Sequence, residues 1–329
     1  MNILAIETSC DETSASIIKD GKIEVSTVIN SQMDIHKAYG GVVPEIASRH
    51  HVENITLVIE EVLEKSKMNI ESIDAFAVTY GPGLIGSLLI GLEAAKTLSL
   101  IYNKPLIPVH HISGHIYANN LVGSLKFPLI CLVISGGHTE ILYMKDNYKY
   151  KILGSTLDDA VGEAYDKVAR VLDFEYPGGP VVDKLSEKGV DSYVLPMPLD
   201  DDTYNFSFSG LKSAVINLIN KEKMKKNDIR KEDLCASFQN IIVKTLVKKT
   251  MRAVKQYKVK QLLLAGGVSA NKQIRKTFEE ECNKINIELL VPPIKYCTDN
   301  AAMIGCSAFY KKVKKNDYKI NPKSVERLK

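Results

Sequence analysis

Two histidines four residues apart, His111 and His115 in the stretch HHISGH, have the spacing of a metal-binding pair. On a helix this spacing stacks two imidazoles on one face, with Cβ atoms roughly 5–6 Å apart. Two nitrogens placed in this way can bind one metal ion at roughly 2.0–2.1 Å each. The preceding residues, NKPLIPVHH, predict a short buried strand that runs directly into the helix. The pair also fits two surface histidines, so a third ligand is needed to decide between the two interpretations.

Polar turns after buried strands are further candidates for chemistry. Residues 2–7, NILAIE, predict a buried strand, and the turn TSCDETSAS that follows offers the carboxylates of Asp11 and Glu12. Actin-like ATPases hold phosphate and metal in acidic turns of this kind, although a plain surface hairpin has the same pattern. GPGLIGS at 81–87 predicts backbone N–H groups at a helix N-terminus, which is an anion site. It matches neither the Walker A nor the dinucleotide pattern.

The strand–turn–strand pattern of the N-terminus returns in the second half of the chain. PLICLVISGGHTEILYMK, from residue 128, has the same order as NILAIETSCDETSASIIKD, which indicates a duplicated domain. Several polar residues then occupy helix starts or helix faces. Asp166 lies on an amphipathic helix at 158–174, and Asp183 lies one turn into the helix that follows PGGP. Asn271 and Asp299 each lie near the start of a later helix, where an N-cap role is the structural alternative for Asn271.

Composition is that of an ordinary globular protein, with 45% hydrophobic and 25% charged residues in 329 positions. The six cysteines form no CxxC pair, and we expect free thiols in a reducing cytoplasm. No apolar run reaches the ~18 residues of a membrane span. The formal net charge of +4 is compatible with nucleic acid, and lysines gather at 221–231 and 310–319. Such lysine runs are also typical of solvated faces. In the segment 36–55, the residues that could either line a tRNA-binding groove or have a structural role are His36, His50, His51 and Arg49.

Taken in order, ten motifs resemble the TsaD family, the catalytic subunit of tRNA threonylcarbamoyladenosine synthesis, once labelled O-sialoglycoprotein endopeptidase. The resemblance runs from residue 2 to residue 310 and rests on AIETSCDETS, GGVVPEIASRHH, TYGPGLIGSL, HHISGH, ISGGHTE, LDDAVGEAYDKVAR, YPGGP, NFSFSGLK, LAGGVSAN and CTDNAAMIG. It implies an α/β chain with the duplicated actin/hexokinase-like (ASKHA) ATPase fold, in which two lobes flank a nucleotide cleft. We expect the lobes at 1–125 and 126–329.

The resemblance also implies an enzyme and its ligands. The enzyme would be a tRNA N6-adenosine threonylcarbamoyltransferase, which transfers the threonylcarbamoyl group from threonylcarbamoyl-AMP to the N6 amine of adenosine 37, in tRNAs that read codons beginning with A. The metal ligands would be His111, His115 and Asp299, with Fe²⁺ expected ahead of Zn²⁺ or Mg²⁺. The nucleotide and substrate positions would be Ile134, Ser135, Gly136, Gly137, His138, Asp166, Gly179, Asp183 and Asn271. For the general base we name Asp11 and Glu12.

The resemblance also implies partners, and three rival functions are weighed against it. Bacterial members of the family work with TsaB-like and TsaE-like subunits and a TsaC-like enzyme that makes the donor, so we expect these partners, tRNA and a cytoplasmic location. A metallopeptidase is disfavoured because HHISGH lacks the glutamate of HEXXH. A small-molecule kinase of the same fold would need no histidine-bound metal. A non-enzymatic scaffold would keep its function after His111 is mutated.

Overall fold

The computed structural model describes residues 1–311 and 316–328, and these divide into two compact units. Unit 1 comprises Met1–Leu125, Asn147–Lys149 and Pro292–Lys329, and unit 2 comprises Lys126–Asp146 and Tyr150–Val291. The second unit begins at Lys126, where we placed the boundary between the lobes. Residues from Pro292 onward, which we expected in the second lobe, group with unit 1 instead.

Unit 1 contains a mixed five-stranded sheet in the order β3-β2-β1-β4-β5. β1 pairs antiparallel with β2 and parallel with β4, and β5 is parallel to β4. The strands are β1 (Asn2–Glu7), β2 (Glu12–Lys19), β3 (Ile23–Ser31), β4 (Ala75–Gly81) and β5 (Leu106–His110). The helices are α1 (Met33–Lys37), α2 (Pro44–Ser66), α3 (Ile85–Ile101), α4 (His111–Tyr117) and α10 (Ala301–Tyr310), with short 3₁₀ turns at Ile70–Ser72, Ala118–Leu121 and Ile294–Tyr296.

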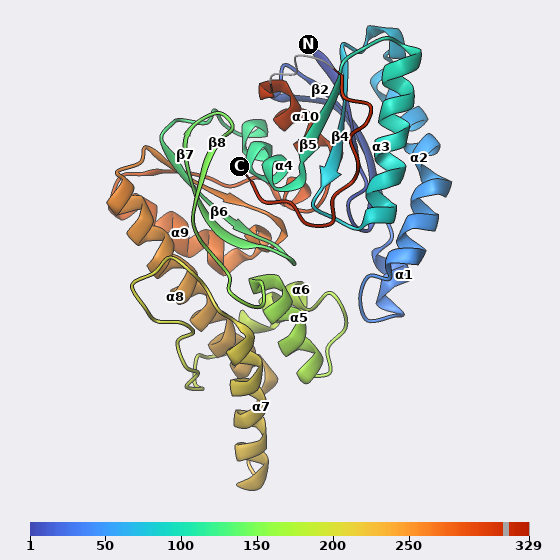
Figure 1. Cartoon of the computed structure of the whole chain (residues 1–329). Coiled ribbons are helices and arrows are strands. Elements are labelled where there is room, and N and C mark those ends of the chain that lie inside the picture. The colour runs from blue at the N-terminus through green and yellow to red at the C-terminus, as the bar shows by residue number, and fades with distance from the viewer. Residues whose placement is uncertain (312–315, 329) are drawn as a thin grey trace. The chain divides into compact units, whose positions relative to one another are not determined.

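Alternating side chains of β1 explain why both faces of this sheet are covered. Leu4 and Ile6 belong to the apolar core that α2 and α3 complete, and both helices cover one side of the sheet in Figure 1. Ala5 points to the other face, where Gly305 of α10 packs so closely that a Cβ on it would lie 2.6 Å from Ile18. A strand buried on both faces needs apolar residues at every position, as NILAIE has at 3–6. The mostly apolar α10 therefore joins the first sheet despite its distance in sequence.

Unit 2 repeats this topology in a second mixed sheet of five strands, in the order β10-β9-β6-β7-β8. β6 pairs antiparallel with β7 and parallel with β9, as β1 does with β2 and β4, so the predicted duplication is confirmed. The strands are β6 (Leu129–Ile134), β7 (Thr139–Asp146), β8 (Lys149–Ser155), β9 (Gln261–Ala265) and β10 (Glu288–Leu290). The helices are α5 (Val161–Val171), α6 (Gly178–Ser186), α7 (Ser209–Met224), α8 (Lys231–Tyr257) and α9 (Lys272–Lys284), with a 3₁₀ turn at Gly267–Ala270.

Helices α5, α6 and α8 pack on one another beside this sheet and share a single apolar core with it. The long α8 supplies many of the buried side chains, including Phe238 and Ile242. In contrast, α7 buries only Leu211 and Val215 near its start, and its C-terminal part extends away from the sheet of unit 2 (Figure 1). Within residues 1–311 and 316–328, none of the helices combines the length and apolar character that a membrane span requires.

Candidate functional site

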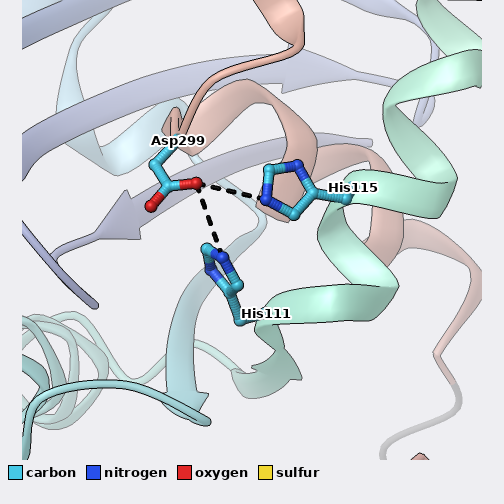
Figure 2. A group of neighbouring side chains, drawn as sticks. All are labelled: His111, His115 and Asp299. Atoms are coloured by element: carbon cyan, nitrogen blue, oxygen red, sulfur yellow. Dashed lines mark ion pairs between the residues drawn. The ribbon is translucent and has the colours of Figure 1, made fainter. Parts of the chain in front are cut away.

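The predicted metal ligands His111, His115 and Asp299 meet in unit 1 (Figure 2). Each offers one ligand atom, and these atoms all lie within 4.8 Å of one another. The Nε2 atom of His111 lies 3.5 Å from Oδ1 of Asp299, and Nε2 of His115 lies 3.1 Å from the same oxygen. The two imidazoles are buried and meet edge to face, with centroids 4.7 Å apart. Two imidazole nitrogens and one carboxylate oxygen form a set that leaves open positions on a metal.

The start of helix α4 holds the first histidine. β5 ends at His110, whose Nδ1 accepts a hydrogen bond from the backbone N–H of Ile112 and so caps the helix. His111 then begins the helix directly at the carboxyl end of β5, as the sequence predicted. Gly114 lets the helix approach α10, because a Cβ there would lie 2.7 Å from the side chain of Ile304. This close packing brings the segment that carries Asp299 to the histidines.

A second layer of side chains orients His111. Its Nδ1 lies 3.1 Å from Oγ of Ser9 and 3.4 Å from Oε2 of Glu7. Glu7 is fully buried and accepts hydrogen bonds from the hydroxyl of Thr79 and from the backbone N–H of Ser9, both at 2.5 Å. A carboxylate beside Nδ1 requires that nitrogen to carry the proton, which leaves the Nε2 lone pair for a metal. The residues present therefore fit a divalent metal ion.

Electrostatics at this site favour a positive charge. Burial by itself lowers the pKa of His111, but the carboxylates of Asp299 and Glu7 outweigh burial and raise the pKa to about 9. In the metal-free protein a proton on His111 therefore balances the carboxylates, and a bound cation would replace that proton.

All three ligands lie in unit 1, although the expected division at residue 126 placed Asp299 in the second lobe. Asp299 immediately precedes α10, and α10 packs against α4 and β1. The metal site thus connects an early and a late part of the sequence within one unit.

The acidic turn between β1 and β2 approaches the same site. Burial raises the pKa of Glu12 well above its ordinary value, and the neighbouring carboxylates of Asp299 and Asp11 raise it further. Oε1 of Glu12 accepts a hydrogen bond from the hydroxyl of Ser31 at 3.2 Å, which partly opposes these effects. Asp11 and Glu12 therefore belong to the surroundings of Asp299.

The predicted nucleotide residues all belong to unit 2. Ile134 ends β6, and a tight turn follows in which Ser135 N–H donates to the carbonyl of His138 at 2.8 Å. The hydroxyl of Ser135 accepts from the N–H of His138 at 3.1 Å, which closes the turn from the other side. Gly136 and Gly137 form its exposed tip, where an added Cβ would meet no heavy atom within 4 Å. The backbone of this tip is therefore open to a ligand.

Helices α5 and α6 position the next pair of predicted residues. Oδ1 of Asp166 accepts a hydrogen bond from the N–H of Gly178 at 2.7 Å, so this carboxylate caps the start of α6. Burial raises the pKa of Asp166, while the N–H groups of Gly178 and Gly179 oppose that shift. Gly178 lies so close to Ala169 that a Cβ there would lie 2.3 Å from the alanine side chain. The close packing of α6 on α5 therefore accounts for the glycine at position 178 of the PGGP turn.

Asp183 lines a cavity, and Asn271 directly precedes Lys272, another of its lining residues. The space measures about 310 Å³ and is lined by Asp183, Ser186, Glu187, Gln239, Lys272, Gln273 and Lys276. Oδ2 of Asp183 accepts from the N–H of Lys272 at 3.3 Å, and burial raises the pKa of Asp183. Asn271 caps α9, because its Oδ1 accepts from the N–H of Ile274 at 2.9 Å. The N-cap alternative for Asn271 is confirmed, and its side-chain amide nitrogen remains oriented toward Gln239.

Comparisons with known proteins identify the family. Residues 24–306 match the family model described as TsaD, tRNA N6-adenosine threonylcarbamoyltransferase. A Bacillus subtilis (strain 168) protein of that name is 58% identical over 319 residues, which cover 95% of this chain and 92% of the relative. A Staphylococcus haemolyticus protein of the same name is 56% identical, over 94% of this chain and 90% of the relative.

The chain belongs to the TsaD family.

Its activity is that of a tRNA N6-adenosine threonylcarbamoyltransferase, an enzyme of tRNA modification, as the resemblance implied.

Solved structures agree on the fold of this TsaD-family chain. HypF in its phosphate- and nucleotide-bound form has a TM-score of 0.62 at 15% identity, covering 94% of this chain and 55% of that one. Component A of the (R)-2-hydroxyglutaryl-CoA dehydratase of Acidaminococcus fermentans has a TM-score of 0.54 at 17% identity, covering 94% and 98%. Together with the two five-stranded sheets, these likenesses confirm the predicted actin/hexokinase-like fold.

Sequence reasoning missed one buried residue at each of the two sites of this TsaD-family chain, Glu7 in unit 1 and Gln239 in unit 2. Glu7 ends a strand in a run of apolar residues, and only its position directly before the acidic turn could have drawn attention to it. Gln239 lies within a long amphipathic helix and belongs to none of the motifs that we used. Both act on side chains distant in sequence, so no local pattern marks them.

The contacts of His36 and His51 support the structural one of the two roles that we left open. His36 and His51 are fully buried. Nδ1 of His36 accepts from the N–H of Val43, and the ring of His51 contacts the hydroxyl of Thr13 and the carbonyl of Cys10. These two are structural. His50 and Arg49 are more exposed and lie near glutamates of their own helix.

Proposed function

We propose that threonylcarbamoyl-AMP is the donor for this TsaD-family enzyme, and that the acceptor is the N6 amine of adenosine 37, just 3′ of the anticodon, in tRNAs that read codons beginning with A. The amine nitrogen would attack the carbamoyl carbon, forming a C–N bond as the bond from that carbon to the phosphate oxygen breaks. AMP leaves with the bonding electrons, and the nitrogen releases a proton to a base. The lone pair of this amine is delocalised into the ring, so the reaction depends on positioning and proton removal.

The nucleotide part of the donor would bind in unit 2. The observation that carries this proposal is the open tip of the 134–138 turn in the unit that also contains the cavity at Asp183. Exposed backbone N–H groups at a glycine turn stabilise phosphate oxygens. Asp166 and Asp183 offer carboxylate oxygens to ribose or threonyl hydroxyls. Asn271 and the glycine-rich 265–271 segment would contact the base and sugar.

In unit 1, His111, His115 and Asp299 would hold one divalent metal ion. We propose Fe²⁺, because a set of two imidazoles and one carboxylate is typical of iron and also suits zinc, whereas Mg²⁺ prefers oxygen ligands alone. When bound, the metal supplies a Lewis acid for an oxygen of the donor. Glu7 and Ser9 would keep the His111 ring in the orientation that binds it.

Proton removal is assigned to the acidic turn. We propose Glu12, with Asp11 as the alternative, because burial and two neighbouring carboxylates raise the pKa of Glu12. A carboxylate whose pKa is raised accepts a proton more readily than an ordinary one.

The tRNA would contact the C-terminal end of α7. Lys221, Lys223, Lys225 and Lys226 are all exposed there, and Figure 1 shows this end extending from unit 2. Clustered lysines bind the phosphate backbone without reading the bases. In the second stretch that we noted, 310–319, residues 312–315 lie outside the described residues.

We further propose a cytoplasmic location, TsaB-like and TsaE-like partner subunits, and a TsaC-like enzyme as the source of the donor, because the family's bacterial members use these companions.

One experiment tests the reaction directly. The chain is reconstituted with these companions, tRNA, threonine, bicarbonate and ATP, and the tRNA nucleosides are then measured by mass spectrometry. We expect N6-threonylcarbamoyladenosine to accumulate, and to be absent without this chain. Incubation with a glycoprotein tests the peptidase alternative, in which cleavage would appear instead. Full activity after His111→Ala would favour a scaffold role and contradict the proposed metal site.

A further inference from the structure

Gln239, in the N-terminal half of α8, is a buried amide that connects two of the unit 2 residues expected to bind the ligand, Asp183 and Asn271. Its side chain is 1% exposed. Its Oε1 accepts hydrogen bonds from Nδ2 of Asn271 at 2.8 Å and from the hydroxyl of Tyr165 at 3.3 Å. Its Nε2 donates to Oδ1 of Asp183 at 3.0 Å. One side chain of α8 thus contacts residues of α5, α6 and the start of α9.

The chemistry of these groups allows only one arrangement. An ionised carboxylate can only accept, so the N–H₂ end of Gln239 has to face Asp183 and its carbonyl end has to face Asn271. Asn271 is constrained in the same way, because its Oδ1 accepts from the N–H of Ile274 and its Nδ2 must then turn to Gln239. One N–H of Asn271 remains without a partner among the described residues. Oδ2 of Asp183 retains accepting capacity beyond its contact with Lys272.

The surroundings of Gln239 make a purely structural role costly. Its neighbours on α8 include the buried Phe238 and Ile242, which pack in the apolar core of unit 2. An apolar residue would fit such a position without the need to satisfy a buried amide. Gln239 also lines the 310 Å³ cavity together with Asp183, and its Nε2 lies 3.1 Å from Oε1 of Gln273, another lining residue. Its polar contacts therefore lead toward the cavity.

We propose that Gln239 is a positioning residue, which holds the carboxylate of Asp183 and the amide of Asn271 in the orientation that binds an adenine nucleotide in this cavity. The inference rests on the nucleotide site proposed above. Without Gln239, Asp183 and Asn271 keep their helix contacts but lose their mutual orientation. The ligand then meets a carboxylate and an amide that must be ordered during binding, which weakens affinity.

The test uses the full chain and two substitutions, Gln239→Leu and Gln239→Glu. Leucine removes all polar contacts and is one atom shorter, whereas glutamate keeps the acceptor and replaces the donor with a negative charge beside Asp183. The matched control is Gln261→Leu, because Gln261 is also a fully buried glutamine of unit 2. It lies at the start of β9, whereas Asn271 follows the end of that strand, and its Oε1 accepts a hydrogen bond from the N–H of Lys126 at 3.0 Å. Isothermal titration with a non-hydrolysable ATP analogue gives the dissociation constant.

We expect the dissociation constant to rise at least tenfold in both Gln239 variants and to stay within twofold of wild type in Gln261→Leu. In the reconstituted reaction, KM for the donor should rise more than kcat falls. Metal content should be unchanged, because the metal ligands lie in unit 1. If Gln239→Leu does not fold, Gln239→Glu still decides the question, because it preserves the size of the side chain.

Two outcomes overturn the inference, and they differ in what else they overturn. If folded Gln239 variants melt at a lower temperature but bind the analogue as wild type does, while Asp183→Ala and Asn271→Ala bind it weakly, Gln239 is only structural and the nucleotide site stands. If Asp183→Ala and Asn271→Ala also bind as wild type does, the nucleotide site itself is wrong, and the role of Gln239 falls with it.

Discussion

Gly137→Val tests the proposed nucleotide site with little damage to the fold. An added Cβ at Gly137 meets no heavy atom within 4 Å, and the residue is exposed at the tip of the 134–138 turn. The backbone of this residue does not lie in the left-handed region, so valine is tolerated. The turn keeps its hydrogen bond from Ser135 to His138. We expect the free energy of unfolding to change by less than about 1 kcal/mol, as for other surface substitutions.

The expected effect on the ligand is much larger. An ATP analogue present at about 100 times its dissociation constant stabilises the folded wild type by about 2.7 kcal/mol. In a unit of this size, each kcal/mol raises the melting temperature by roughly 2–4 °C, so the analogue should raise it by roughly 5–11 °C. If the valine side chain occupies the space of the phosphate and weakens binding about 100-fold, the same concentration contributes only about 0.4 kcal/mol. The rise should then shrink to roughly 1–2 °C.

The assay is differential scanning fluorimetry across a range of analogue concentrations. Gly210→Val is the matched control, because Gly210 also has open space around an added Cβ and lies outside this turn. The control should keep the full rise in melting temperature. A full rise in Gly137→Val would refute the reasoning and place the nucleotide away from the 134–138 turn.

Three further predictions concern the metal and the tRNA. His111→Ala should lower metal affinity by more than the 10–100-fold typical of residues that only orient a ligand, and elemental analysis should show metal content and transfer activity falling together. The metal-free protein should become less stable as pH rises from about 6.5 to 9, by up to about 3 kcal/mol. The reason is that the folded pKa of His111, about 9, lies above the ordinary 6.5, because the neighbouring carboxylates outweigh burial. Changing Lys223, Lys225 and Lys226 to Glu should weaken tRNA binding and flatten its salt dependence, by roughly 0.9 in logarithmic slope for each phosphate that the protein no longer neutralises.

Each of these measurements has its own control. Full metal occupancy in His111→Ala would exclude this histidine as a ligand. For the pH series, the free energy of unfolding of His111→Gln should not decrease between pH 6.5 and 9. A decrease equal to that of the wild type would assign the effect to another group. For tRNA, the control is the same charge change at three exposed lysines at the other end of α8 and beyond it, Lys255, Lys258 and Lys260. Equal tRNA affinity and equal salt dependence in the two triple variants would mean that the lysines at the end of α7 are solvated and do not bind tRNA.

Local patterns in the sequence determined much of this protein. The spacing of His111 and His115 predicted their meeting, because residues four apart on a helix always share a face. The strand–turn–strand pattern at 2–19 and again from 128 predicted two similar sheets, since alternation and turn residues act over a few positions. The motifs, in their order, were sufficient to indicate the family, which the comparisons then confirmed.

The tertiary structure decided which distant residues meet. Asp299 reaches the histidines because α10 packs on the first sheet, and an apolar helix fits either sheet as far as its own sequence is concerned. For this reason the late segment from Pro292 belongs to unit 1, and our division of the chain at a single point did not capture that. The roles of Glu7 and Gln239 could not be predicted from their neighbours in sequence, because a buried polar residue is explained only by its partners. Those partners come from other elements, and only the packed chain brings them within hydrogen-bonding distance.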